Sequence, residues 1–458
     1  MEDFMTQARE QKSLLAEILT LSIPTMLGMM FDMLYEMVDM AWVAKLSIDS
    51  VAAVTIFATI WWILNMVNDI VGTSSVTIIS RYFGAGNKEK TIEAIEQTII
   101  FKFLLALVVG IVMSLIIPNV LSPLAGNSRV LEESVTYGRI RLITLPLAFS
   151  SYSVNTALRC IGDARKPLYI MVISGMLNMI LDPIMIFDVI PFIGVRGMGL
   201  GIAGAAYATV ISQAAAFIVG LYILMSGRTF IKVGFKRGIY FVRSMDIKLL
   251  SIGLPTGLEG LLRNLGYFIV MKFIASFGVG VVAAYGICTR IINLILTPVF
   301  GLQMGSGVIV GQSLGSSNCD RAEKAGYLTA KLSFWIMFIS GAVLVLLPGP
   351  IIRIFSTGDD IIGIGALFLR YYAVASLFMG PAGGMASILY GAGDNVPSML
   401  AALTSIWLVQ IPMLYLFVQI MQMSIQWVWI SYIVSYAVHF VMIVYFVKKG
   451  KWKDKCVI

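Results

Sequence analysis

Long runs of apolar residues, separated by short polar turns, extend along almost the whole chain. A helix that crosses a bilayer needs about 20 mostly apolar residues. The runs are continuous, without the alternation of a membrane β-barrel strand. The pattern therefore predicts an all-α membrane protein with twelve transmembrane helices, at 14–43, 50–79, 92–117, 131–158, 166–188, 199–226, 247–276, 281–310, 325–348, 362–391, 398–421 and 425–447.

The composition supports this prediction. Hydrophobic residues make up 59% of the 458 residues and charged residues only 13%, whereas a soluble domain carries about 25% charged residues. So few charges cannot solvate the surface of a folded protein of this size. Lipid must surround most of the chain, which excludes coiled coils, disordered tails, nucleic-acid binders and secreted disulfide scaffolds.

The basic residues indicate an orientation in the membrane. Twelve spans place both termini on one side. If that side is the cytoplasm, the outer segments hold only Lys45, Arg129, Arg196 and Arg353, and the other basic loop residues lie inside. The positive-inside rule then predicts a multi-pass protein of the plasma (cell inner) membrane with both termini cytoplasmic. This distribution also accounts for most of the net charge of +8 without a nucleic-acid partner.

The two halves of the sequence resemble each other at one constant offset of 231 residues. An even number of spans in each half keeps both halves in the same orientation, as parallel repeats. We therefore predict a six-helix N-terminal lobe (1–226), a polar cytoplasmic linker (227–246) and a six-helix C-terminal lobe with a basic tail (247–458). The matches are Pro24-Thr25 with Pro255-Thr256, Val51-Ala52-Ala53 with Val282-Ala283-Ala284, Gly84 and Asn87 with Gly315 and Asn318, and Gly162-Asp163 with Gly393-Asp394.

The chain offers little material for enzyme chemistry. Its four cysteines, Cys160, Cys288, Cys319 and Cys456, form no CxxC pair and are expected to be free thiols. The single histidine, His439, lies in an apolar stretch. Because no metal motif or nucleophile–base pair is present, we expect neither an enzyme nor a protein with a bound cofactor.

The first span carries three acidic residues. Asp32, Glu36 and Asp39 are spaced i, i+4 and i+7, which places them on one face of a helix. A charge at mid-membrane costs about 2.5–3.5 kcal/mol, so at least one of the three is expected to titrate or to bind a cation. Asp32 and Glu36, with the adaptable side chains of Met33 and Met37, are candidates for a substrate cavity. Polar contacts with another span are the alternative for these two acids.

Four segments resemble the multidrug and toxic compound extrusion (MATE) family, and specifically its DinF-like branch. They are the turns SRYFGAGNKEK and ALRCIGDARKP, the stretch NMILDPIMIF in the fifth span and GIAGAAYATVIS in the sixth. The resemblance implies a V-shaped, two-lobed antiporter that exports organic cations or amphiphilic drugs in exchange for H⁺ or Na⁺ by alternating access. The expected partners are such drugs and the bilayer, and the protein is expected to be monomeric.

The same resemblance implies a polar coupling network in the N-terminal lobe. The network takes up H⁺ or Na⁺, and a Na⁺ ion would bind at Asp39, Asn178 and Asp182; residue types alone do not decide between the ions. The second half lacks this chemistry, since Val270 and Ala386 stand where the first half has Asp39 and Asn155. The residues carried over from the family are Asp39, Tyr137, Asn155, Asn178, Asp182 and Thr209.

Pro24 interrupts the backbone hydrogen bonds of the first span, and either a hinge or a static kink would follow. In the seventh span, Glu259 and Arg263 are spaced i, i+4 and are expected to form a structural ion pair.

The main rival function is a flippase of the same superfold that moves a lipid or a lipid-linked oligosaccharide. Such a protein should have a basic cavity for the pyrophosphate, whereas the first span here is acidic. A membrane-embedded enzyme is a second rival. The bases inside the membrane are few: Lys102, Arg139, Arg141, Arg263, Lys272, Arg290, Lys331 and Arg370.

Overall fold

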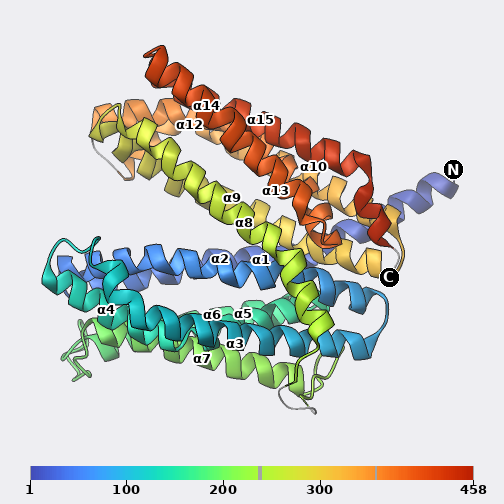
Figure 1. Cartoon of the computed structure of the whole chain (residues 1–458), viewed down its shortest axis with the longest axis horizontal. Helices are drawn as coiled ribbons and strands as arrows, with labels where there is room; N and C mark the ends of the chain where they lie inside the picture. Colours follow the sequence, from blue (N-terminus) through green and yellow to red (C-terminus); the bar gives the residue numbers. More distant parts are fainter. Residues whose placement is uncertain (1, 236–239, 356–357, 457–458) are drawn as a thin grey trace. The chain divides into compact units, whose positions relative to one another are not determined.

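The computed structural model describes residues 2–235, 240–355 and 358–456, with side chains from Ser13 to Lys455. Residues 236–239 of the predicted linker, including Lys236 and Arg237, lie outside the described residues. Nearly all of the described chain is helical (Figure 1). Its β structure is confined to one isolated bridge between Val189 and Arg196, and the prediction of an all-α protein is confirmed.

The elements follow one another as helices joined by short turns. They are α1 (Glu2–Ala44), α2 (Ile48–Gly84), α3 (Lys88–Leu121), α4 (Ser128–Ile143), α5 (Leu145–Cys160), α6 (Arg165–Ile186), α7 (Ile202–Met225), α8 (Arg243–Ala275), α9 (Val279–Gly315), α10 (Cys319–Leu346), α11 (Pro348–Arg353), α12 (Asp359–Ala392), α13 (Asn395–Leu403), η1 (Thr404–Gln410), α14 (Ile411–Leu414), η2 (Tyr415–Ile420), α15 (Gln426–Lys449) and η3 (Lys451–Cys456).

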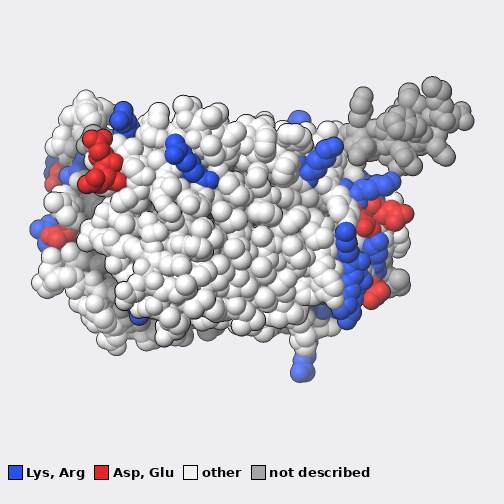
Figure 2. Space-filling view, turned by 90° about the horizontal axis from the view of Figure 1, so that it is seen from above, with Lys and Arg blue, Asp and Glu red and all other residues white. Residues whose placement is uncertain are grey.

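Ten segments of the described chain are long and apolar enough to cross a membrane. The predicted spans 131–158 and 247–276 are not among them, although both are helical. The first is divided into α4 and α5, and the second is α8, which carries Glu259 and Arg263 in its middle. Figure 2 shows a broad uncharged face, with Lys, Arg, Asp and Glu side chains mainly near its two ends.

The predicted fourth span breaks at Thr144. This residue leaves the helical region at φ −97° and ψ 6°, and α5 begins directly after it. Pro146 follows in the first turn of α5, where its missing N–H is tolerated but would interrupt a continuous helix. The sequence prediction of one unbroken helix was therefore wrong at this point.

The predicted eleventh span is helical throughout, but not uniformly α-helical. The π-helical segments η1 and η2 alternate with α13 and α14. The Ser435 hydroxyl on α15 donates to the Ser405 carbonyl at 2.9 Å, so a side chain of a neighbouring helix is hydrogen-bonded to one backbone carbonyl of η1. Wide turns of this kind are rare and occur mostly as short segments.

The chain forms two compact units. The N-lobe unit comprises Leu27–Phe83 and Asn87–Ser251, and the C-lobe unit comprises Met1–Met26, Gly84–Gly86 and Ile252–Ile458. The helices α1 and α8 thus contribute residues to both units. The predicted lobe boundaries, which follow the repeat, do not coincide with these divisions and stay a prediction.

Within the N-lobe unit, α3, α5, α6 and α7 run side by side (Figure 1). Its core includes Phe57, Leu142 and Phe149. Gly204 on α7 lies against α6 so closely that a Cβ atom there would be 2.4 Å from the Met185 carbonyl oxygen. Only glycine allows this approach, which brings the polar faces of α6 and α7 together.

Within the C-lobe unit, α9, α10, α12 and α15 pack around an apolar core. Aromatic rings fill its centre, with Phe368 and Trp429 only 4.3 Å apart between centroids. Val270, the repeat counterpart of Asp39, is fully buried in this core. An apolar side chain is what such a position requires.

The linker after α7 is held on the N-lobe unit by two buried residues of α3. Glu96 accepts hydrogen bonds from the Phe235 amide at 2.8 Å and the Tyr240 hydroxyl at 3.0 Å. Gln97 donates to the Tyr240 carbonyl at 2.9 Å and accepts from the Val242 amide at 3.1 Å. Burial and the bond to Glu96 raise the pKa of the Tyr240 hydroxyl. Hydrogen bonds to α3 therefore hold the described part of the linker on the N-lobe unit.

The segment η3 folds back onto the C-lobe unit. Trp452 is fully buried, Lys453 pairs with Glu323, and Lys455 pairs with Asp394 at 3.2 Å. Cys160 and Cys288 form no disulfide bond, as expected, but Cys319 is disulfide-bonded, so that part of the prediction was wrong. Spacing along the sequence could not show that distant cysteines meet.

Candidate ion-coupling site

The candidate site lies within the N-lobe unit, where α1 and α6 bring two acidic residues together. Asp182 on α6 is fully buried, and Asp39 on α1 is partly buried. The two carboxyl groups interact electrostatically with each other. Because two carboxylates repel each other at short range, a proton or a cation between them would stabilise the pair.

Asn178 and Thr209 extend the pair toward α7. The Asn178 amide nitrogen lies 3.3 Å from Asp182 Oδ1 and 3.5 Å from the Thr209 Oγ1. The Thr209 hydroxyl donates to the Ala205 carbonyl, so it is oriented to accept from Asn178. All three side chains are buried, and their spacing of one helical turn on α6 puts Asn178 and Asp182 on one face.

Several oxygen atoms of this group have no partner among the described residues. They are Asp39 Oδ1, Asp182 Oδ2 and Asn178 Oδ1. A buried polar atom without a partner costs about 1–3 kcal/mol. Unsatisfied acceptors are therefore expected where a proton or cation is taken up, and these three belong to the residues predicted for that role.

Tyr137 reaches the site from α4. Its buried ring packs edge-on against Phe57, with centroids 5.4 Å apart. Asn155 is buried on α5 in the same unit, but no hydrogen bond joins it to the other five residues in the described part of the chain. Hydrogen bonds thus join Asn178, Asp182 and Thr209, and the role of the six residues stays a prediction.

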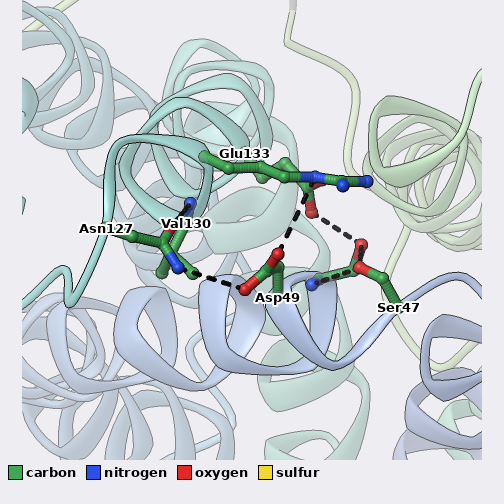
Figure 3. Close-up of polar contacts among 7 residues, drawn as sticks. Ser47, Asp49, Asn127, Val130 and Glu133 are labelled. Atoms are coloured by element: carbon green, nitrogen blue, oxygen red, sulfur yellow. Dashed lines mark hydrogen bonds and ion pairs between the residues drawn. The ribbon is translucent and has the colours of Figure 1, made fainter.

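A polar network at the start of α4 fixes the helix that carries Tyr137 (Figure 3). The Ser50 hydroxyl on α2 donates to Glu133 Oε2 at 2.6 Å, and Arg129 donates to Glu133 Oε1 at 3.2 Å. Asn127 caps α4 by accepting from the Val130 amide at 2.8 Å. Glu133 lies one turn before Tyr137, so these contacts set the position of the tyrosine.

The residues predicted for the substrate cavity lie further along the same face of α1. Glu36 is exposed and Asp32 is half-buried, and Met37 has 70% of its surface exposed. Asp32 and Glu36 are electrostatically coupled to each other and to Tyr152 on α5. A partly open face with acidic and aromatic groups suits a cationic, amphiphilic ligand.

Sequence reasoning did not assign Arg141 and Lys102 to the site. Arg141 is buried on α4, 4.3 Å above the Trp61 ring, and acts electrostatically on Glu36 and Asp39. Its spacing of four residues from Tyr137 was the signal that could have found it. Lys102 is almost fully buried on α3 and donates to Asn68 at 2.8 Å.

The C-lobe unit has a different polar centre. Arg263 donates to Glu259 at 2.6 Å, and the Tyr390 hydroxyl lies 3.3 Å from both oxygens of Glu259. Both carboxylate oxygens of Glu259 therefore accept hydrogen bonds, as expected for a structural ion pair. In neither unit do the described residues contain a cluster of three or more His, Cys, Asp and Glu side chains that could hold a metal ion.

The duplicated sequence is recognised by a single family model. The model, described as MatE, matches residues 24–184 and again residues 255–416, and the two matches begin at the repeat-related Pro24 and Pro255. The chain belongs to the MATE family. Its predicted fold of two MATE repeats is confirmed, and so is the prediction of a transporter that is not an enzyme and needs no prosthetic cofactor.

Individual MATE proteins resemble the chain over nearly its full length. "Probable multidrug resistance protein YoeA" of Bacillus subtilis (strain 168) is 25% identical, covering 99% of this chain and 97% of the relative. The "FAD transporter" of Shewanella oneidensis is 27% identical over 75% of each chain.

Solved structures show the same fold. A structure described as the "outward-facing conformation of a multidrug resistance MATE family transporter of the MOP superfamily" matches with a TM-score of 0.86 and 25% identity, covering 96% of each chain. The chain therefore has the fold of these MATE transporters.

Proposed function

We propose that this MATE protein is a secondary antiporter that exports organic cations or amphiphilic drugs in exchange for H⁺ or Na⁺. The observation that carries the proposal is the group of unpaired buried oxygen atoms on Asp39, Asn178 and Asp182 inside the N-lobe unit. A buried acidic pair of this kind is costly to keep without a function. Relatives named for multidrug resistance support export of drugs.

The coupling site consists of Asp39 and Asp182 with Asn178, Thr209 and Tyr137. When a proton or Na⁺ ion is bound, the two carboxyl groups attract a shared charge and hold α1 against α6. When the ion leaves, two carboxylates remain and repel each other. A bound ion therefore favours one arrangement of α1 and α6, and the free site favours another.

Exchange follows if the drug prefers the arrangement that the ion disfavours. A ligand shifts a conformational equilibrium only through its different affinities for the two states. We assign drug contact to the open acidic face of α1 with Asp32, Glu36, Met33 and Met37. Bending of α1 at Pro24 on ion binding would then close this face and release the drug.

The remaining parts of the proposal follow the predictions from the sequence. Both termini face the cytoplasm, the protein lies in the plasma membrane, and it acts as a monomer. The linker 227–246 connects the two lobes along the chain. These statements rest on the distribution of Lys and Arg, on the repeat, and on the likeness to transporters of the family.

A flippase function is the alternative, since the family's fold is shared with flippases. It would require a basic cavity for phosphate groups. The site described above is instead dominated by Asp32, Glu36, Asp39 and Asp182, with Arg141 among them. The excess of acidic groups favours cationic substrates over lipid phosphates.

The test is gradient-driven export of ethidium, a fluorescent organic cation, from proteoliposomes containing purified protein. Asp39→Asn should lower export at least about tenfold, because the amide keeps the size of the side chain and removes its ionisation. Val270→Ala alters the repeat-related position of α8 without burying a polar group and serves as the control. Export by Asp39→Asn at the wild-type rate would rule out the coupling role.

A further inference from the structure

A short basic segment follows the last membrane-spanning helix of the described chain. The helix α15 ends at Lys449, and Gly450 leads directly into η3. Gly450 has φ 75°, a left-handed conformation that favours glycine and ends the helix. Five lysines lie within residues 448–455: Lys448, Lys449, Lys451, Lys453 and Lys455.

Two of these lysines and a tryptophan hold η3 on the C-lobe unit. The Trp452 side chain is fully buried. Lys453 forms an ion pair with Glu323 in the first turns of α10. Lys455 forms another with Asp394, which precedes α13, at 3.2 Å. The segment is therefore fixed in place, and the charges of these two lysines are compensated.

The other three lysines have no acidic partner in the described part of the chain. Lys448, Lys449 and Lys451 are all exposed, and the ion pairs of η3 do not include them. Lys449 Nζ lies 5.6 Å from the centroid of the Tyr445 ring, which leaves its charge uncompensated. Asp454 is also exposed and is not in an ion pair among the described residues. Three free ammonium groups thus stand against one free carboxylate.

The free lysines continue an exposed apolar face of α15. Val441 has 63% of its surface exposed and Tyr445 has 56%. The spacing of four and three residues places Val441, Tyr445 and Lys448 on one face of the helix. Because α15 is long and apolar enough to cross a membrane, its exposed apolar residues meet lipid chains. Tyrosines gather at the level of the headgroups, so the lysines after Tyr445 lie at the level of the lipid phosphates.

We propose that Lys448, Lys449 and Lys451 form a binding surface for the headgroups of anionic phospholipids. Basic clusters directly after a transmembrane helix are attracted to anionic lipid. The attachment of η3 to the C-lobe unit favours binding, because less of the segment must become ordered when the lipid binds. The proposal does not depend on the antiport function, since it concerns residues of the C-lobe unit only.

The test measures the binding of fluorescent phosphatidylglycerol to the purified full-length protein in a neutral detergent, by fluorescence anisotropy. Wild type should bind the probe saturably. Unlabelled phosphatidylglycerol should displace it, and zwitterionic phosphatidylcholine should not. The triple variant Lys448→Gln, Lys449→Gln, Lys451→Gln should bind at least about tenfold more weakly, since each lysine near an anionic surface contributes about fivefold.

The matched control replaces the same three lysines by arginine, which keeps the positive charges, and should bind the probe as wild type does. Equal displacement by phosphatidylcholine would refute recognition of the anionic headgroup. Unchanged affinity in the glutamine variant, or an equal loss in the arginine variant, would show that these charges do not form the surface. Displacement by inorganic phosphate as effective as by phosphatidylglycerol would identify a free anion as the ligand and overturn the proposal.

Discussion

Replacing Asp182 by asparagine tests whether the acidic pair works through its proton. The Asp182 carboxyl group accepts from Asn178, whose amide nitrogen is 3.3 Å away, and interacts electrostatically with Asp39. An asparagine amide can donate to Asp39 permanently, and its oxygen can still accept from Asn178. The variant therefore imitates the protonated pair but cannot release the proton.

The size of the effect on stability follows from these bonds. A hydrogen bond to a charged group contributes about 1.5–3 kcal/mol, and Asp182→Asn keeps that bond. Its free energy of unfolding should stay within about 1 kcal/mol of wild type. Asp182→Ala removes the bond from Asn178 and leaves the Asn178 amide with Thr209 alone as an acceptor in a buried site. The loss of this bond should lower the free energy of unfolding by about 1–3 kcal/mol.

Two measurements on the same preparations check the reasoning. The thermal unfolding temperature in detergent should fall for Asp182→Ala and change little for Asp182→Asn. Ethidium export driven by a pH gradient should fall at least about tenfold in both variants, since neither can exchange a proton at this position. Undiminished, pH-driven export by Asp182→Asn would show that the pair does not carry the coupling ion.

Two further predictions concern how the helices move and how they are joined. Pro24→Ala restores a backbone N–H donor in α1. This variant should still bind the coupling ion but should export the drug more slowly. Drug affinity measured against pH tests the first expectation, and the rate of export tests the second. Full transport with full ion dependence would make Pro24 a static kink. Glu96→Ala removes two hydrogen bonds to the linker and should lower the free energy of unfolding by about 1–3 kcal/mol, whereas Glu96→Gln, which keeps one acceptor, should lose less. Equal unfolding temperatures for Glu96→Ala and wild type would mean that the linker is not held by this residue.

The sequence by itself determined the fold class, the repeat and most of the acidic site. Long apolar runs that lie in lipid can hardly form anything but helices, because a helix provides hydrogen-bond partners for its own backbone N–H and C=O groups. The i, i+4 spacing of Asn178 and Asp182 placed both on one face of α6 before any coordinates were considered. The repeat that relates Pro24 to Pro255 could likewise be detected from the sequence alone.

Only the tertiary structure decided what depends on contacts between distant segments. The hydrogen bond from Asn178 to Thr209 joins α6 to α7, and the place of Arg141 over the Trp61 ring depends on how α4 packs against α2. The docked linker depends on Glu96 and Gln97 meeting a segment about 140 residues away in the chain. Periodicity fixes which face of a helix a residue occupies, but only packing fixes which other helix that face meets.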